Sequence, residues 1–518
     1  MTLDALVIKP WKTDYQRNEY QAGFYKKSAE NYEALTFDDV LIAPGSSQVK
    51  PGEVDVQSYF SRNVPLKIPV VSAAMDKVTG LRMLIWMAKL GGLGILHRHM
   101  SKEDQAQIVE RAKYALNVLI EKPITFRPQT TVGEILEAKR KHNYEFNSFP
   151  IVNDENKLVG LVTGHHMYFV SREPGRRVES FMTPVSSLVT GPKDMDHEAA
   201  YEFMMKNMLK KLPLVDSDGV LSGLYDMDNL EEVITHKDTL NLDSRGQLMV
   251  GAAVGVYDYE RADILVRKNV NVLVVDSAHG GHKDVVATVR ELKRLYPNTD
   301  CVGGNISAIQ AARDLIAAGA DGLKVGQGPG SICDTRIVAG AGMPQITAIM
   351  NAVEGTQGAV PINADGGIRY SGDIPKAIAA GAQSVMLGSQ LAGTDESPGE
   401  PVLHKGRRYK KIRGMGSESA MREREEAKER YGQGGEAKFV PEGVEGIVPY
   451  KGKLADALHQ FVGGLRAGMG YAGAASIKDL NRIAKLVKPT AAGVRESHPH
   501  DIIITEEAPN YQTPTEGG

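Results

Sequence analysis

Short apolar runs rich in valine and isoleucine, each ending in small or polar residues, recur along most of the chain. Most are followed by a helix-like stretch, such as residues 308–320 or 372–382. Continuous apolar strands that alternate with amphipathic helices indicate parallel strands buried on both faces. Eight such units predict a closed (β/α)8 barrel, and an open doubly wound sheet is the alternative. The eight runs lie at residues 68–76, 92–100, 248–255, 270–280, 299–307, 321–330, 361–367 and 383–390.

The alternation is interrupted between about residues 118 and 238, where the chain contains a short internal repeat. Its copies, 149–167 and 212–228, each have the pattern of a strand, an acidic turn, a second strand and a helix. One copy cannot bury its own apolar face, so we expect the two to pair into one module. This module is inserted after the second barrel strand. The predicted domains are an N-terminal extension (1–33), a first part of the barrel (34–117), the inserted module (118–238) and a second part of the barrel (239–518).

Residues 401–452 have a different character from the rest of the predicted barrel. The segment is dense in charge and glycine and poor in apolar residues, so we expect it to bury little surface. One interpretation is a solvated surface excursion. A long excursion from the active-site end of a barrel is more often a lid or a binding loop, and this favours the functional interpretation.

Composition narrows the class of protein further. A chain of 518 residues is too long for one ordinary core, and 42% hydrophobic with 24% charged residues is typical of a globular protein. The net charge of −3 gives no reason to expect nucleic acid or an anionic membrane as partner. Two cysteines cannot form a disulfide framework, which favours the reducing cytosol. No stretch has the pattern of a signal peptide or of a membrane-spanning helix, and we therefore expect a cytoplasmic protein.

One of the two cysteines lies in an unusual place. Cys333 belongs to the stretch GPGSICDTR, in the loop that follows the sixth predicted barrel strand. Glycines 326, 328 and 330 allow the backbone to turn sharply and to approach a ligand closely. A thiolate is favoured where oriented N–H dipoles or cations surround it, so Cys333 is a candidate nucleophile. Cys301 lies within a predicted strand and is interpreted as a packed, inert residue.

Two more loops at the same end of the predicted barrel have residues suited to bind a nucleotide beside this cysteine. The stretches NADGGIR (363–369) and LGSQ (387–390) follow the seventh and eighth strands, where barrels often bind phosphate through backbone N–H groups. Asp365 is suited to accept hydrogen bonds from two ribose hydroxyls, and its alternative role is that of a turn residue before two glycines. Together these features predict a site for a nucleoside monophosphate that is attacked covalently. No G-x-G-x-x-G stands at a strand–helix junction, so a dinucleotide would have to lie across the barrel mouth.

From about residue 34 to its C-terminus the chain resembles the inosine-5′-monophosphate (IMP) dehydrogenases. The cysteine loop together with ADGGIR is specific to this family and to its relative, GMP reductase. The resemblance implies a (β/α)8 barrel that oxidises IMP to xanthosine monophosphate (XMP) with NAD, the committing step of guanine nucleotide synthesis. The matching stretches are LTFDDVLIAPG, VSAAMD, VGAAVGV, GGN, VGQGPGSICDTRIVAG, ADGGIR, RGMGS, EGVEG and RESHPHD.

The resemblance implies roles for individual residues. Cys333 would attack C2 of the purine, and hydride would pass from C2 to NAD. Thr335 would assist water activation together with Glu442, which would touch the purine N1 and O6 edge. The implied IMP-binding residues are Ser331, Asp365, Gly366, Gly367, Gly388, Ser389, Gly414, Met415, Gly416 and Glu442. The implied cofactor-binding residues are Asp276, Ser277, Asn305, Gly326 and Gly328.

The resemblance also implies a moving part and a cation. In the family a flap enters the vacated cofactor site and its Arg-Tyr pair, here Arg430 and Tyr431, activates the hydrolytic water. Arginine is an unusual base because its pKa exceeds about 12. Carbonyl oxygens would hold a K+ ion shared with a neighbouring subunit, which implies a homotetramer that contacts between inserted modules extend to an octamer. The implied K+ ligands are Gly326, Gly328 and Cys333, with Glu496, Ser497 and His498 from the neighbour.

The inserted repeat resembles a tandem pair of CBS domains, which often bind adenine nucleotides. Such domains usually carry Thr or Ser followed three residues later by Asp, which holds the ribose. Here the first copy has Thr163 and His166, and the second has Asp226 and Asn229. A structural or assembly role therefore stands beside the binding of adenine or guanine nucleotides. The position of the insertion favours the dehydrogenase over the reductase.

Two residues depart from the family pattern. Ile412 stands where the family usually has a tyrosine that contacts the IMP phosphate, so this contact is either missing or supplied by Lys411 or Tyr409. Asp334 stands where threonine is common, and its charge beside the nucleophile opposes thiolate formation. Residues 1–33 have no recognisable counterpart in the family.

Two rival functions remain to be weighed. GMP reductase shares the barrel and the cysteine but carries out a reductive deamination with NADPH and lacks the hydrolytic flap, so Arg430 and Tyr431 favour the dehydrogenase. The second rival is a catalytically silent nucleotide-sensing scaffold. Such a scaffold needs none of Cys333, Thr335, Arg430 and Glu442, and their joint presence argues against it.

Overall fold

The protein is described here by a computed structural model. It describes residues 19–30, 33–116, 118–142, 144, 146–506 and 508–511. Two compact units are present. One unit combines residues up to 115 with 239–243 and 248–518, and we call it the barrel unit. The other unit, residues 116–238 with 244–247, is called the inserted unit. Of the predicted N-terminal extension, only α1 (Glu19–Glu30) and residue 33 lie within the described residues.

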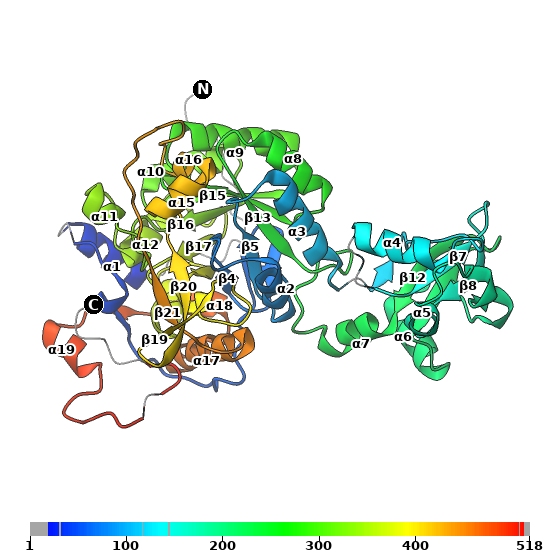
Figure 1. Cartoon of the computed structure of the whole chain (residues 1–518). Helices are drawn as coiled ribbons and strands as arrows, with labels where there is room; N and C mark the ends of the chain where they lie inside the picture. Colours follow the sequence, from blue (N-terminus) through cyan, green and yellow to red (C-terminus); the bar gives the residue numbers. More distant parts are fainter. Residues whose placement is uncertain are drawn as a thin grey trace. The chain divides into compact units, whose positions relative to one another are not determined.

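Eight parallel strands form a closed barrel in the barrel unit (Figure 1). Val71 pairs with Leu93, Gly94 pairs with Val250 across the insertion, and Val385 pairs with Val70 to complete the ring. The open doubly wound sheet is therefore excluded, and the predicted (β/α)8 barrel is confirmed. In chain order the strands are β4 (Val70–Ser72), β5 (Leu93–Leu96), β13 (Val250–Val254), β14 (Val272–Asp276), β15 (Asp300–Ile306), β16 (Gly322–Val325), β17 (Ile362–Asp365) and β18 (Ser384–Leu387).

Helices surround this barrel and cover its apolar exterior. The expected helix 308–320 is observed as α10, and the expected helix 372–382 as α13, each shorter than its pattern because both end in alanine and glycine turns. No helix in the described part of the chain is long and apolar enough to span a membrane. Besides α1 and two helices within residues 401–452, the described helices of the barrel unit are α2 (Leu81–Lys89), α3 (Lys102–Tyr114), α8 (Tyr259–Arg267), α9 (Lys283–Leu295), α10 (Ile309–Ala317), α11 (Thr335–Val338), α12 (Gln345–Thr356), α13 (Asp373–Ala379), α14 (Ser389–Ala392), α17 (Leu454–Ala472), α18 (Ile477–Ile483) and α19 (Ala491–Glu496).

A short hairpin closes the amino-terminal end of the barrel. It consists of β2 (Ser58–Ser61) and β3 (Val64–Leu66), and β2 contacts strands β15 to β18. Phe60 of this hairpin is fully buried, and the backbone N–H of Arg62 donates to the Asp321 carbonyl just before β16. A second small pair joins β1 (Leu41–Ile42) to β22 (Leu486–Val487). The carboxyl ends of the strands are left for the functional loops.

The inserted unit contains the two predicted repeats. Each copy forms a hairpin followed by a helix, and the two hairpins join at their acidic turns, where Leu158 N–H donates to Gly219 and Leu221 N–H donates to Asn156. The expected pairing of the copies is thus observed. The elements are β6 (Leu119–Ile120), α4 (Val132–His142), β7 (Phe149–Val152), β8 (Leu158–Val162), α5 (Gly164–Val170), β9 (Thr183–Pro184), β10 (Gly191–Pro192), α6 (His197–Lys206), β11 (Lys211–Val215), β12 (Leu221–Asp226) and α7 (Met227–His236).

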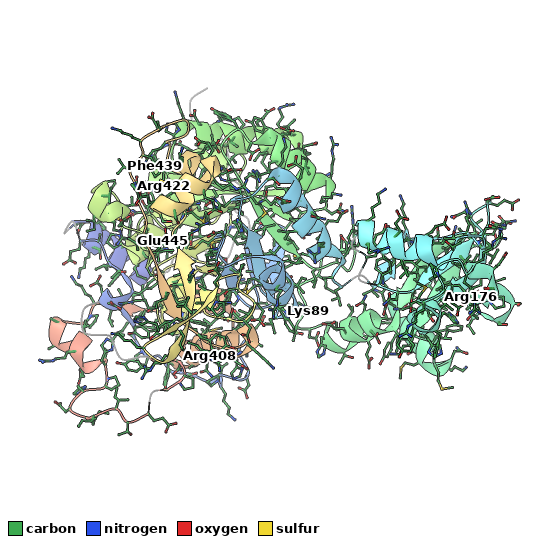
Figure 2. The ribbon with its side chains drawn as sticks, in the orientation of Figure 1. Lys89, Arg176, Arg408, Arg422, Phe439 and Glu445 are labelled. Carbon is green, nitrogen blue, oxygen red and sulfur yellow. The ribbon has the colours of Figure 1, made fainter. Side chains whose placement is uncertain are left out.

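Residues 401–452 are more structured than their composition suggested. They form a three-stranded sheet of β19 (Pro401–His404), β20 (Arg407–Arg413) and β21 (Glu445–Pro449) and two helices, α15 (Glu418–Glu423) and α16 (Glu425–Arg430). The expectation of little burial is wrong for the helices, because their few apolar residues fall on one face. Arg408 and Arg422 lie on exposed parts of the segment (Figure 2). The buried cluster consists of Met415, Ala420, Met421 and Ala427. We call residues 418–443 the flap segment.

The close packing of the barrel strands predicts that a larger side chain at a strand glycine will destabilise the fold. A Cβ atom at Gly251 of β13 would collide with the end of the Ile95 side chain and lie 2.9 Å from Val272 Cγ1. We expect Gly251→Val to lower the free energy of unfolding by about 1–3 kcal/mol, the usual result of overpacking. Urea denaturation measures this change. The control Gly52→Val lies in an exposed turn with no atom within 4 Å of its Cβ position, and a comparable loss there would contradict the packing argument.

Candidate functional site

The cysteine loop and the ADGG loop are packed against each other at the carboxyl end of the barrel. Gly326 follows β16 with φ of +146°, and a Cβ atom there would collide with the carbonyl oxygen of Asp365 at the end of β17. A Cβ atom at Gly366 would lie 3.0 Å from Pro329 Cγ. Only glycine permits this close approach with this backbone conformation. The two loops that the sequence singled out therefore form one surface.

Cys333 is half-buried in this surface and is a free thiol. Its Sγ atom lies 3.2 Å from Thr335 Oγ1 at the start of α11. The Cys333 backbone pairs with Gly443, and Val444 N–H donates to the Ile332 carbonyl. Cys301, in contrast, is 1% exposed within β15, and burial raises the pKa of its thiol, which keeps it protonated and unreactive.

The RGMGS turn and the segment around Glu442 complete the surroundings of the cysteine. Gly414 N–H donates to Val444, and Glu442 N–H donates to Gly416. These bonds place residues 414–417 and 442–444 beside Cys333. Met75, which packs against the cluster containing Met415, also lies 3.3 Å from the Cβ position of Gly388 in the LGSQ loop. Three of the predicted binding loops are therefore neighbours.

A buried ammonium group lies between two carboxylates of this site. Lys324 of β16 is 2% exposed, and its Nζ atom is 2.7 Å from Asp365 Oδ2 and 3.3 Å from Asp276 Oδ1. Asn305 donates to Asp365 at 2.9 Å and also accepts from Lys324. Asp276 Oδ1 is buried and accepts no hydrogen bond despite the nearby charge. Ion pairs and hydrogen bonds of this cluster thus connect the carboxyl-terminal parts of β14, β15, β16 and β17.

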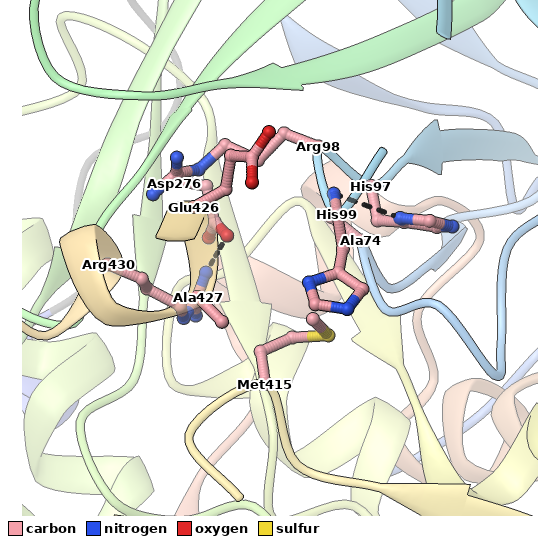
Figure 3. A pocket seen from close by; sticks show the side chains of 9 residues that line it. All are labelled: Ala74, His97, Arg98, His99, Asp276, Met415, Glu426, Ala427 and Arg430. Carbon is pink, nitrogen blue, oxygen red and sulfur yellow. Dashed lines mark hydrogen bonds and ion pairs between the residues drawn. The ribbon is translucent and has the colours of Figure 1, made fainter. Parts of the chain in front are cut away.

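The flap segment reaches into this cluster. Arg430, at the end of α16, forms an ion pair with Asp276, and its carbonyl accepts from Ala278 N–H at 3.0 Å (Figure 3). Burial lowers the pKa of the Arg430 guanidinium, Tyr431 opposes this shift, and the charge of Arg98 adds to it. The ring of Tyr431 covers Gly416, where a Cβ atom would lie 2.5 Å from Tyr431 Cζ. Burial raises the pKa of Tyr431, the Arg430 guanidinium lowers it, and the charges of Cys333 and Glu442 raise it further.

Little space remains between α16 and the barrel. A cavity of about 10 Å³ is left there, enough for about one water molecule (Figure 3). Burial lowers the pKa of His97 in its wall to about 4, so this imidazole is neutral at pH 7. The flap segment therefore fills the region in front of Asp276. The cavity is lined by Ala74, His97, Arg98, His99, Asp276, Met415, Glu426, Ala427 and Arg430.

The three residues predicted as neighbour-supplied cation ligands lie apart from the cysteine loop of their own chain. His498 contacts Tyr511 at 3.2 Å and packs near the ring of Tyr370, and Ser497 donates to Gly493. Within the described part of residues 490–511, no hydrogen bond or ion pair joins Glu496, Ser497 or His498 to the loop of Cys333.

The two departures from the family pattern have clear local environments. Ile412 is 3% exposed and belongs to the core of the barrel unit. Lys411, the next residue of β20 toward the N-terminus, is exposed and forms an ion pair with Glu400 at 2.7 Å. Its ammonium is therefore paired with this carboxylate here and not free for the IMP phosphate. Asp334 Oδ1 is buried and has no hydrogen-bond partner.

Two important residues escaped the sequence analysis. Lys324 stands in the apolar strand stretch DGLKVG, where a single charge inside a buried strand is itself a signal of a buried partner. Arg98 follows β5 in the stretch LHRHM and is buried at 5% exposure, with its guanidinium 3.0 Å from Glu429 of the flap segment. The partners of both residues lie far away in sequence, so no local pattern could identify them.

These features define an α/β-barrel protein with a cysteine, a charged cluster and a covering arginine–tyrosine segment at the carboxyl ends of its strands. Residues 34–500 match the IMP dehydrogenase / GMP reductase domain, and the chain belongs to this family. The inosine-5′-monophosphate dehydrogenase of Aquifex aeolicus is 49% identical over 485 residues, covering 92% of this chain and 98% of that enzyme. The enzyme of the same name from Bacillus subtilis is 46% identical, covering 92% of this chain and 98% of its own length.

Solved structures provide a second comparison. A cysteine-to-alanine variant of GMP reductase from Trypanosoma brucei, in complex with guanosine 5′-monophosphate, matches with a TM-score of 0.83 and 42% identity. The match covers 92% of this chain and 100% of that chain, so it extends through most of the inserted unit. The expectation that the insertion favours a dehydrogenase is therefore not supported, because a GMP reductase chain spans it too.

The buried charge cluster predicts a large difference between two lysines. We expect Lys324→Met to destabilise the protein by about 3–5 kcal/mol, because it leaves two carboxylates facing each other without the ammonium. Lys411→Met removes an exposed ion pair and should change stability by at most about 1 kcal/mol. Urea denaturation of the two variants and of Lys324→Arg tests this, and equal stabilities for all three would refute the electrostatic role of Lys324.

Proposed function

We propose that this protein oxidises IMP to XMP with NAD through a covalent bond to Cys333. The observation that carries the proposal is the placement of Arg430 and Tyr431 beside the cysteine loop, since a residue pair that activates water serves an oxidation that ends in hydrolysis. The high identity to inosine-5′-monophosphate dehydrogenases over nearly the full chain supports it.

In the first half-reaction the Cys333 thiolate attacks C2 of the purine and forms the S–C2 bond, while the hydride leaves C2 with its electron pair. NAD, when bound, supplies the hydride acceptor. Ser331, Gly366, Gly367, Gly388 and Ser389 would hold the phosphate. Asp365 would accept the hydrogen bonds of the ribose hydroxyls, and the Lys324 ammonium at 2.7 Å holds that carboxylate in place.

In the second half-reaction water attacks C2, the S–C2 bond breaks and the thiolate of Cys333 is restored. Arg430 and Tyr431 would accept the proton of this water, assisted by Thr335 at 3.2 Å from the sulfur. Burial of the Arg430 guanidinium lowers its pKa, which is the direction a base requires. Glu442 would orient the N1 and O6 edge of the purine from the segment paired with Gly416.

The residues proposed to bind NAD have groups that suit its nicotinamide ring, which is cationic and carries an amide. Among the described residues no group donates a hydrogen bond to the buried Asp276 Oδ1, although the Lys324 ammonium lies 3.3 Å away, and a nicotinamide carboxamide could provide such a donor. Ser277 and Asn305 share backbone hydrogen bonds at the ends of β14 and β15, next to this carboxylate. Arg430 occupies the front of Asp276 here, so the flap segment would leave this position while NAD is bound.

A K+ ion is the second implied group. Among the described residues no hydrogen-bond donor reaches the carbonyl oxygens of Gly328 and Cys333, so these oxygens fit a cation. The carbonyl oxygen of Gly326 accepts a hydrogen bond from the Asn305 side chain at 2.8 Å, and this bond would have to break for the oxygen to bind K+. Glu496, Ser497 and His498 of a neighbouring copy would complete the shell, which requires an oligomer. The family resemblance implies a homotetramer, with an octamer as the larger assembly.

GMP reductase is the second candidate function, because the T. brucei structures share fold and sequence with this chain. Arg430 and Tyr431 favour the dehydrogenase, since a reductase has no use for hydrolysis of its covalent intermediate.

For the inserted unit we propose a CBS pair that binds purine nucleotides. A T. brucei GMP reductase 38% identical to this chain has been solved with guanosine 5′-triphosphate. In this chain Thr163 and Asp226 stand at the N-termini of α5 and α7, and Asp226 also pairs with Lys211. A purely structural role of the unit is the alternative.

The reducing cytoplasm is the compartment that suits the free thiol of Cys333.

The two half-reactions can be separated by following NADH absorbance with IMP, NAD and K+. We expect sustained NADH and XMP production by the wild type, and no NADH from Cys333→Ala although it still binds IMP. Arg430→Ala should give a stoichiometric burst of NADH followed by turnover about 10²–10⁴-fold slower, because one proton-transfer group is lost. Arg422→Ala removes an exposed flap arginine and serves as control.

Each alternative has its own outcome in this experiment. Consumption of NADPH with GMP, without IMP oxidation, would establish the reductase. Normal steady-state turnover by Arg430→Ala would remove that residue from the hydrolytic step. Absence of both reactions in the wild type would leave the silent scaffold.

The cation proposal predicts a response to K+ beyond activity. Replacing KCl by choline chloride at equal ionic strength should slow turnover, and added K+ should raise the melting temperature by mass action on the folded assembly. A melting temperature and a turnover rate that are both independent of K+ would contradict the site.

A further inference from the structure

Three arginines of the barrel unit each pair with a different glutamate of the two flap helices. Arg413, at the end of β20, lies 2.7 Å from Glu423, Arg261 of α8 lies 3.3 Å from Glu426, and Arg98 lies 3.0 Å from Glu429. The glutamates recur every three residues. Glu423 ends α15, while Glu426 and Glu429 lie one turn apart on α16, and the three ion pairs tie both helices to the barrel unit.

Arg98 differs from the other two in its dependence on the flap segment. Arg261 also binds Asp258, and Arg413 also binds Asp76, so both keep a barrel carboxylate if the flap segment leaves. For Arg98, Glu429 provides the single ion pair found among the described residues. Its side chain is 6% exposed, so without Glu429 the buried guanidinium would lose this ion pair and keep only the weaker attraction of the Asp258 carboxylate against the repulsion of Arg261.

Glu429 stands directly before the arginine–tyrosine pair. Consecutive residues at the C-terminal end of α16 are therefore held by three separate parts of the barrel unit. Arg98 holds Glu429, Asp276 and the Ala278 N–H hold Arg430, and Tyr431 lies on Gly416. Arg98 and Asp276 also line the same small cavity (Figure 3).

We propose that Arg98 is a positioning residue for hydrolysis. By pairing with Glu429 it fixes the end of α16 so that Arg430 reaches Asp276 and Tyr431 reaches the cysteine loop. Because the pair exists only when the flap segment is seated, it also favours the seated conformation over the one that admits the cofactor. This inference rests on the proposed two-step oxidation of IMP.

The test compares Glu429→Gln with Glu418→Gln. Glu429 is half exposed, so its substitution should leave the fold intact. Among the described residues Glu418 has one ion pair, with Arg422 inside the flap segment. For Glu429→Gln we expect an unchanged NADH burst, steady-state turnover lower by about tenfold, as for loss of one charged hydrogen bond, and accumulation of the Cys333 adduct in mass spectra. The KM for NAD should fall, because the flap segment competes less for the site. Glu418→Gln should behave as the wild type.

Variants of the arginine extend the test. Arg98→Gln should reproduce Glu429→Gln, the double variant should lose no more than either single one, and Arg98→Lys should recover part of the turnover. Hydrogen exchange of residues 418–431 should be faster in the Gln variants.

The outcomes separate the inference from the proposed function. A normal burst together with normal turnover and normal exchange in Glu429→Gln would overturn the role of Arg98 and leave the oxidation of IMP intact. Equal losses in burst and turnover would show a general structural role instead and would also overturn it. No burst in the wild type would mean that the proposed function itself fails.

Discussion

The buried ammonium of Lys324 is the interaction on which the arrangement of the site depends. It lies between Asp276 and Asp365, two carboxylates from non-adjacent strands that would repel each other without it. One carboxylate faces the loop proposed to bind ribose, and the other faces the flap segment. The strand ends therefore cannot shift independently, and the cysteine loop, which follows the strand carrying Lys324, takes its position from the same cluster.

The charge balance of this cluster explains why a cation covers Asp276. Two carboxylates and one ammonium leave a net charge of −1 in a water-poor site, and the guanidinium of Arg430 neutralises it. Any group that replaces Arg430 there must meet the same requirement. Under the proposed oxidation with NAD, a cationic oxidised nicotinamide ring would meet this requirement and a neutral reduced ring would not, so the cluster would favour the return of Arg430 after hydride transfer.

The barrel could be predicted from the sequence because its signal is local: each strand is a continuous apolar run followed by a helix. The cysteine and ADGG loops could be placed for the same reason, since they follow strands directly. The flap helices could not, because Met415, Ala420, Met421 and Ala427 look sparse in sequence and form a cluster only after folding. Lys324 and Arg98 were missed because their partners lie up to several hundred residues away. Charge pairs between distant segments leave no periodic pattern.

Sequence similarity alone leaves a dehydrogenase and a reductase side by side, since both share the barrel, the cysteine and the length of the insertion with this chain. What would distinguish them chemically is the fate of the bond to Cys333. In the dehydrogenase water breaks this bond, whereas in a reductive deamination ammonia leaves when the bond forms and a hydride from NADPH then replaces the sulfur. The residues near the cysteine therefore determine which of the two reactions the site supports. In this protein these are an arginine and a tyrosine, and an ion pair on one side and a glycine on the other hold them there. A segment held beside the loops that surround Cys333 would be suited to deliver water, which is why the oxidation of IMP is the proposed function.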